Sequence, residues 1–234
     1  MTKPTPPTPT SALTDALDIG ALDTLPRRAN EALAAREHMH KNERDRLDTA
    51  RHEAAHLVAA WAMGAFVDTV HINQSISPTR LPLGRVRAGC VLQREEAFVA
   101  CAGIAWEDTY GHARHAAADL RYAESQMAEL GEDLGSVLPF TRDFIANADT
   151  LINQLAVALY SWAQSNPTGQ VARTKLHRLR SWGEPQIPAF RGAAFVCSAV
   201  AALPRSLLPA LPPTPRNLDI EAMMAELDKV LAKI

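Results

Sequence analysis

The sequence predicts a mainly α-helical fold with a small β element of two or three strands. The first observation is a long segment without proline or glycine, residues 39–63, which is rich in alanine and leucine. The second is that residues 95–110 and 140–164 are apolar or amphipathic over lengths typical of helices. The third is a pair of short β-rich runs, residues 66–73 and 84–92, which directly follow the first helix.

Composition divides the 234 residues into four parts. Residues 1–25 begin with a proline- and threonine-rich stretch, and we expect this tail to be disordered because it has little to bury. Residues 26–203 hold the predicted elements and form the expected folded domain. Prolines predict an extended linker over residues 204–218. Residues 219–234 predict an amphipathic helix, which either docks back on the domain or binds another subunit.

Charge and cysteine usage exclude several classes of protein. The formal net charge of −2 gives no reason to expect a nucleic acid or an anionic membrane as a partner. The three cysteines, Cys90, Cys101 and Cys197, show no paired spacing, which indicates reduced thiols and not a disulfide framework. We find no signal peptide, no apolar run long enough to span a bilayer, and no P-loop. We therefore expect a cytoplasmic protein without a membrane span and without ATPase activity of its own.

The domain is expected to begin with helices and to continue with the two strands. Pro26 suits the first turn of a helix, and the charged residues 36–48 lead into the long helix, which Gly64 should end. A loop containing Pro78 and Pro82 separates the strands. Two interpretations of the strands stay open. They form an edge that holds an extended peptide by main-chain hydrogen bonds, or a hairpin that caps the core.

The last part of the domain is predicted to be helical. Residues 140–164 form a long amphipathic helix, and residues 171–182 form a shorter, basic one. A turn at 166–169 separates the two. We expect both helices to complete the core.

The long helix carries a candidate metal site. His52 and His56 are four residues apart, so on a helix they lie on one face, where one metal ion can bind a nitrogen of each. Glu53 lies beside the pair, close enough to hold a metal-bound water without binding the metal. This is the H-E-x-x-H pattern of zinc peptidases, in which zinc lowers the pKa of the water and the carboxylate takes its proton.

The surroundings of this motif favour a metal site over a chance match in a helical bundle. The helix is apolar on both sides, and buried imidazole and carboxylate groups without partners would be costly, whereas a shared metal satisfies them. One apolar stripe consists of Leu47, Ala50, Ala54, Leu57 and Trp61, and the histidine face continues into Ala59, Ala60 and Met63.

A third protein ligand must come from elsewhere in the chain. The helix that follows residues 95–110 has an expected inward stripe of Leu120, Ala123, Met127 and Leu130. Asp119 borders this stripe, where a carboxylate without a partner is unusual, and it is well suited to bind the metal.

Two other residues have open roles. His115 lies one helical turn before Asp119, so it could bind the metal instead or hydrogen-bond to Asp119. Glu107 could orient a liganding imidazole, or it could be an ordinary charge near a helix end.

Three motifs in order resemble a known family. They are His52-Glu53-Ala54-Ala55-His56, Ala102-Gly103-Ile104-Ala105-Trp106-Glu107-Asp108 and Ala118-Asp119-Leu120. Over about residues 45–130 the chain resembles the proteolytic domain of the FtsH-type, M41 family of zinc metalloproteases. The resemblance implies that His52, His56 and Asp119 bind Zn²⁺, that Glu53 is the catalytic base, and that residues 26–203 are the peptidase domain.

The chain also departs from the family pattern. Ala55 replaces a glycine, and Ala118 replaces an asparagine. The family's AAA ATPase module and membrane anchor are missing, so we expect a standalone peptidase domain. Such a domain would cleave unfolded or flexible chains, or would borrow a separate unfoldase. Full-length relatives are expected to form hexamers, so a homo-oligomer is a further prediction.

The sequence therefore predicts a zinc-dependent metalloendopeptidase that acts on unfolded proteins or peptides. The alternative is a catalytically weak or inactive M41-like protein that works as a binding or adaptor protein.

Overall fold

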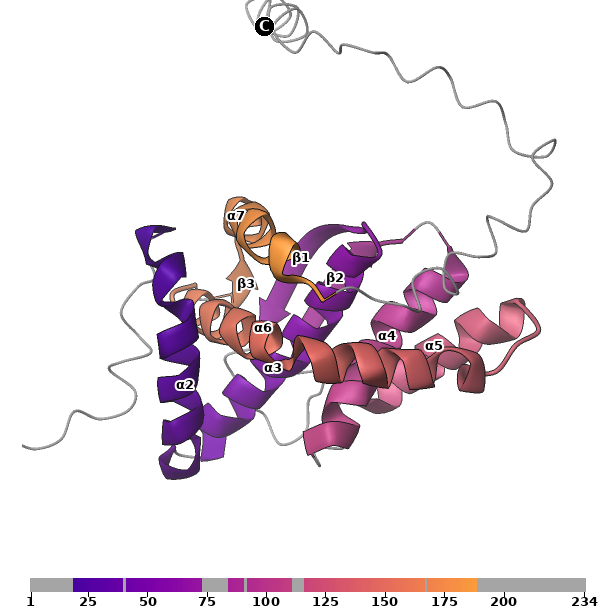
Figure 1. The fold of residues 1–234 in the computed structure, drawn as a ribbon, viewed down its shortest axis with the longest axis horizontal. Coiled ribbons are helices and arrows are strands. Elements are labelled where there is room, and N and C mark those ends of the chain that lie inside the picture. Colours follow the sequence, from indigo (N-terminus) through magenta and orange to yellow (C-terminus); the bar gives the residue numbers. More distant parts are fainter. Residues whose placement is uncertain are drawn as a thin grey trace, which may run out of the picture. The chain divides into compact units, whose positions relative to one another are not determined.

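Helices make up most of the described residues in the computed structural model, and one small sheet lies beside them (Figure 1). The structure describes residues 19–39, 41–72, 84–90, 92–110, 116–166 and 168–188. The expected mainly α fold with a small β element is confirmed. The elements are η1 (Ile19–Thr24), α2 (Leu25–Ala35), η2 (Arg36–His38), α3 (Lys41–Ala62), β1 (Phe66–Ile72), β2 (Gly84–Gly89), α4 (Gln93–Tyr110), α5 (Ala116–Glu129), η3 (Leu134–Ser136), α6 (Leu138–Gln164), β3 (Gln170–Val171), α7 (Arg173–Gly183) and η4 (Glu184–Gln186).

Helix α3 is the centre of the fold. From Thr49 to Trp61 every residue is buried, including the polar ones. The helix packs against α4 and α6, and both β1 and β2 lie against it. A helix that is covered on all sides needs apolar residues around its whole circumference, which is the pattern of this segment.

Helix α3 ends next to Gly64, the residue that the sequence analysis expected to end it. Gly64 has a φ of 71°, a left-handed conformation that glycine adopts without steric cost. Its N–H donates to the carbonyl of Trp61 at 2.9 Å, and the N–H of Ala65 donates to the carbonyl of Ala60 at 2.8 Å. These two bonds are the Schellman arrangement, which stops the helix and turns the chain into β1.

A buried arginine ties α3 to α4 and α6. Arg51 precedes the first histidine, and its guanidinium carbon lies 5.0 Å from the ring centroid of Trp106 and 4.8 Å from that of Tyr110. Its Nε donates to Oδ1 of Asn153 on α6 at 2.8 Å. The cation is thus held between aromatic faces and a hydrogen-bond acceptor, which offsets the cost of its burial.

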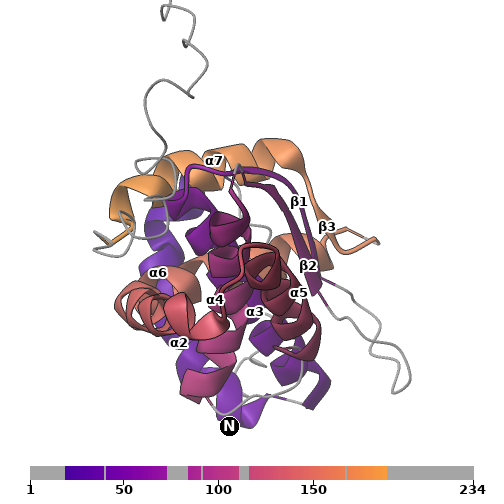
Figure 2. The same ribbon diagram turned by 90° about the vertical axis from the view of Figure 1, so that its right-hand side faces the viewer.

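The sheet has three antiparallel strands in the order β2-β1-β3, which stand side by side along one side of the helices (Figure 2). Val70 of β1 is opposite Val86 of β2 and Val171 of β3. The sequence analysis placed Val171 at the start of a helix, and this boundary is wrong, since α7 begins at Arg173. A strand of two residues is too short to show an alternating pattern.

Among the strands that the structure describes, β2 lies at the edge of the sheet, and its register fixes where its main-chain groups point. The N–H of Ile72 donates to the carbonyl of Gly169 at 2.9 Å, on the β3 side of β1. The main-chain groups of Val70 therefore also point toward β3, and those of Val86, opposite Val70, point away from β1. Gly84, Val86 and Ala88 thus direct their N–H and C=O groups to the open edge, while Arg85 and Arg87 bond to β1.

Two expectations need correction. Residues 19–25 are structured, because Ile19–Thr24 form a 3₁₀ helix and Leu25 is fully buried in the core. On α5, only Ala123 and Met127 of the expected stripe are buried, while Leu120 and Leu130 are each 37% exposed. Among the described elements α5 packs mainly on α4, and Ala123 and Met127 are the residues of α5 that are buried.

Several predictions lie outside the described residues. They include the first part of the tail, His115, the linker at 204–218 and the helix at 219–234. Among the helices that the structure describes, none combines the length and the apolar character needed to cross a membrane.

Candidate metal centre

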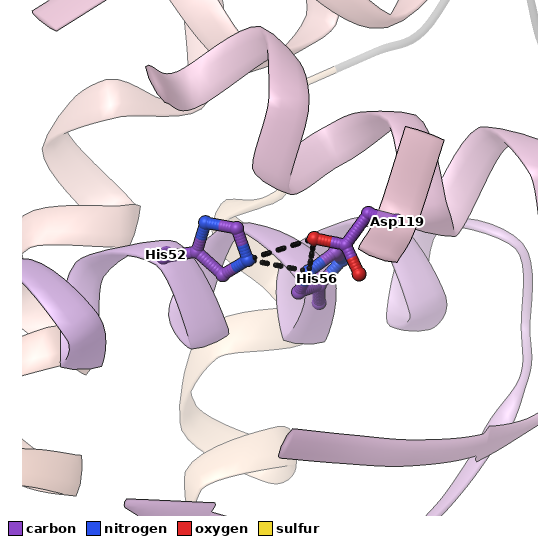
Figure 3. Close-up of side chains that lie close together, drawn as sticks. All are labelled: His52, His56 and Asp119. Carbon is purple, nitrogen blue, oxygen red and sulfur yellow. Dashed lines mark hydrogen bonds and ion pairs between the residues drawn. The ribbon is translucent and has the colours of Figure 1, made fainter. Parts of the chain in front are cut away.

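Three of the predicted site residues lie together between two helices (Figure 3). His52 and His56 come from α3 and Asp119 from the first turn of α5. Nε2 of His52 lies 3.0 Å from Nε2 of His56 and 3.0 Å from Oδ2 of Asp119. Nε2 of His56 lies 3.4 Å from the same oxygen. Two imidazoles and one carboxylate therefore direct one ligand atom each toward a common point.

The separations between these atoms fit a metal ion. In a tetrahedral site with metal–ligand distances of about 2.0–2.1 Å, neighbouring ligand atoms lie about 3.3–3.4 Å apart. The observed separations of 3.0, 3.0 and 3.4 Å are close to this value. Three protein ligands leave the fourth position free for water or a substrate, as in catalytic zinc sites. The group could thus hold a metal ion, and its nitrogen and oxygen donors suit zinc.

His56 is oriented by the backbone of α4. Its Nδ1 lies 2.7 Å from the carbonyl oxygen of Val99, which can only accept a hydrogen bond, so Nδ1 carries the hydrogen and donates. The neutral ring then presents the lone pair of Nε2 to the cluster. A liganding histidine usually donates from its other nitrogen in this way.

His52 is oriented by a buried carboxylate. Nδ1 of His52 lies 3.0 Å from Oε1 of Glu107, whose side chain is 2% exposed. The other oxygen, Oε2, accepts a hydrogen bond from the N–H of Ala116 at 3.2 Å. Because Ala116 is the first residue of α5, Glu107 connects the first histidine to the helix that carries Asp119. The sequence analysis left two roles open for Glu107. These contacts favour the first, in which Glu107 orients the imidazole, over the second, in which it is an ordinary charge near a helix end.

A glycine lets α4 pass directly against the two imidazoles. A Cβ atom at Gly103 would lie 2.5 Å from Cε1 of His52 and 2.6 Å from Nε2 of His56. Contacts this short do not occur between non-bonded atoms, so any larger residue would displace the rings. The sequence analysis gave Gly103 no role of its own. The available signal was a glycine inside an apolar helix, where it costs about 1 kcal/mol relative to alanine.

Glu53 is buried beside the cluster and faces β2. Its side chain is 4% exposed, and Oε2 has no hydrogen-bond partner among the described residues. The N–H of Val86 donates to the carboxylate. A Cβ atom at Gly84 would lie 2.3 Å from Oε1, so this close approach of β2 also depends on glycine. Sequence reasoning found Glu53 but not Gly84.

Burial and charge shift the pKa values of these groups without a metal. Burial alone would lower the pKa of His52, but hydrogen bonds to Asp119 and Glu107 outweigh it and raise the pKa to about 10. The pKa of His56 is also raised, since the charge of Asp119 outweighs the effect of burial. Burial opposes the ionisation of Asp119, yet the imidazoles lower its pKa. Burial raises the pKa of Glu53, and the imidazoles only partly offset this.

A cleft of about 480 Å³ opens over these residues. Its walls come from α3, β2, α4 and α5, so the candidate ligands, Glu53 and the open edge of β2 all face one space. The lining residues are His52, Glu53, His56, Gly84, Arg85, Val86, Arg87, Ala88, Cys90, Glu96, Val99, Ala100, Ala118, Asp119 and Tyr122.

The arrangement can bind one divalent cation and can move a proton at Glu53, beside an edge strand. Comparisons of the chain with models of protein families, with curated proteins and with solved structures gave no match.

Proposed function

We propose that this chain is a zinc-dependent metalloendopeptidase that hydrolyses peptide bonds in unfolded or flexible proteins. The observation that carries the proposal is the convergence of His52, His56 and Asp119, with the buried carboxylate of Glu53 beside them in one cleft. The M41-like order of motifs supports the same function, because Asp119, which the resemblance assigns as third ligand, reaches the two histidines.

Each residue has a chemical role in this proposal. His52, His56 and Asp119 would hold the zinc ion, which supplies a water of lowered pKa and a Lewis acid for the substrate carbonyl. Glu53 would take a proton from water on Oε2, the oxygen without a hydrogen-bond partner among the described residues, and return it to the leaving amine. Its raised pKa suits both steps, because a carboxylate with an ordinary pKa is a weaker base.

The open edge of β2 suggests how a peptide is held. The carbonyl of Val86 and the main-chain groups of Ala88 face the edge, next to the cleft. An extended peptide can pair with such an edge through its own main chain, so recognition would tolerate many sequences. Pairing requires an extended segment, which a folded substrate does not offer. For this reason we propose unfolded or flexible proteins as substrates. A separate unfoldase and a homo-oligomer stay predictions.

The test combines metal analysis with hydrolysis. Elemental analysis of the purified protein should give about one zinc ion per chain, and the protein should cleave an unfolded substrate such as casein. Glu53→Gln should keep the zinc and lose cleavage by about 10²- to 10⁴-fold, because the proton transfer is lost. Cleavage by Glu53→Gln at the rate of the original protein would overturn the mechanism. Bound zinc without any cleavage would favour the adaptor alternative.

A further inference from the structure

Two arginines on β2, Arg85 and Arg87, line the cleft. Arg85 and Arg87 are exposed, line the cleft, and make no ion pair with any residue in the described part of the chain. Arg94 near the start of α4, by contrast, contacts Glu132. An unpaired pair of guanidinium groups at the rim of a cleft is available to a ligand.

The pleat of β2 places both side chains on the same face. Successive residues of a strand point to opposite faces, so Arg85 and Arg87 share one face while Gly84, Val86 and Ala88 share the other. The alternating exposure of β2 agrees with this arrangement. Across the strand pair, the arginines are opposite His71 and Thr69 of β1, so no carboxylate is directly opposite either one.

A peptide on the open edge of β2 would continue this pattern. Its residues that lie opposite Arg85 and Arg87 would direct their side chains to the arginine face, at alternating positions. The residues between them would point to the other face, that of Gly84, Val86 and Ala88, and the apolar lining residues of the cleft include Val99, Ala100 and Ala118. The two faces thus select different side chains.

We propose that the cleft prefers extended peptides with acidic side chains at two alternating positions, separated by a small or apolar residue. The inference rests on the proposed function, because it assigns the substrate class of the same cleft. Opposite charges on directly paired residues of neighbouring strands attract, whereas like charges repel. Asp or Glu at both positions would pair with the two guanidinium groups, and lysine would be disfavoured.

The first experiment measures binding separately from hydrolysis. Zinc-loaded Glu53→Gln protein is titrated with three fluorescent peptides that share one β-prone host sequence. The first has two Glu separated by one residue, the second has Gln at those positions, and the third has the two Glu adjacent. We expect the first peptide to bind roughly fivefold more tightly than either of the others. The third peptide has the same charge, so it separates strand pairing from general charge attraction.

The second experiment assigns the preference to the two arginines. The double variant Arg85→Gln/Arg87→Gln, in the same Glu53→Gln background, should bind all three peptides equally. The matched control is Arg121→Gln/Arg178→Gln, which removes two exposed cations that do not line the cleft. This control should keep the roughly fivefold preference. Two results would overturn the inference. One is equal binding of the three peptides by the Glu53→Gln protein that keeps both arginines, and the other is a preference that survives in the double arginine variant.

Hydrolysis by the protein with Glu53 intact distinguishes this inference from the proposed function. Cleavage of all three peptides with equal kcat/KM would leave the endopeptidase proposal standing and remove the preference. A preference in binding that depends on Arg85 and Arg87, with no cleavage of any peptide, would support the inference and count against the endopeptidase.

Discussion

The Cα atom of Gly103 faces His52 so closely that a Cβ atom there would lie 2.5 Å from Cε1 of the imidazole. The same atom would lie 2.6 Å from Nε2 of His56, the nitrogen directed toward Asp119. The spacing between α3 and α4 at the candidate metal centre is therefore set by a residue without a side chain.

Gly103→Ala should weaken zinc binding by about 10- to 100-fold, the range typical of changes to groups that position metal ligands. The added methyl group pushes both imidazoles away from the common point, and overpacking should also lower the free energy of unfolding by about 1–3 kcal/mol. Competition with a chelator of known affinity measures the zinc effect. Gly89→Ala is the control, because its Cβ would have only one neighbour, at 4.0 Å. Unchanged zinc affinity in Gly103→Ala would contradict the role given to this glycine.

Gly84→Ala should separate metal binding from proton transfer. The new Cβ would lie 2.3 Å from Oε1 of Glu53, while no ligand atom is among its close neighbours. We expect zinc affinity close to that of the original protein and a fall in kcat of at least about tenfold, because the carboxylate must move. Zinc titration and peptide hydrolysis are measured on the same preparation. A variant that loses zinc and activity together would show that β2 shapes the metal site and not only the base.

Glu107→Gln tests the connection from His52 to α5. The amide keeps the size of the side chain but removes the charge that stabilises a proton on Nδ1 of His52. Zinc affinity should fall about 10- to 100-fold. Asp108→Asn is the matched control, since Asp108 is exposed and pairs with Arg142 at the surface. Equal zinc affinity in both variants would mean that Glu107 is only a structural charge.

The sequence could predict the parts of the centre that depend on local spacing. His52, Glu53 and His56 lie within one helical turn and a half, so the period of a helix is enough to bring them together. Asp119 was found through its place in an ordered set of motifs. The contacts of Gly84 and Gly103 could not be predicted, because they depend on how β2 and α4 pack against α3.

The fold shows the same division. The long helices and β1 and β2 are evident from composition and periodicity, and the structure confirms them. The strand β3 is too short to leave a pattern, and Leu120 and Leu130 are exposed although Ala123 and Met127 of the same expected stripe are buried. Periodicity shows which residues share a helix face, but not how much of that face a neighbour covers.

The metal-free centre should make stability depend on pH. The pKa of His52 is raised from 6.5 to about 10, so its contribution to stability is fully present below about pH 6.5 and is lost as the pH rises through 10. The pKa of Asp119 is lowered from 3.8, so its contribution is present above about pH 3.8 and is lost as the pH falls through the lower value. We expect the metal-free protein to be most stabilised by this pair between about pH 4 and 6.5. Urea unfolding measured from below about pH 4 to above about pH 10 tests this, and His52→Gln should reduce the loss of stability on the alkaline side.

Zinc should displace the proton that His52 holds. A liganding imidazole must be neutral, yet below about pH 10 His52 is protonated without the metal. Binding at pH 7.5 should therefore release at least about one proton, and the apparent zinc affinity should rise with pH up to about 10. Calorimetry in two buffers of different ionisation enthalpy counts the protons directly. A count near zero at pH 7.5 would mean that His52 is already neutral, and that Asp119 and Glu107 do not hold a proton on the ring.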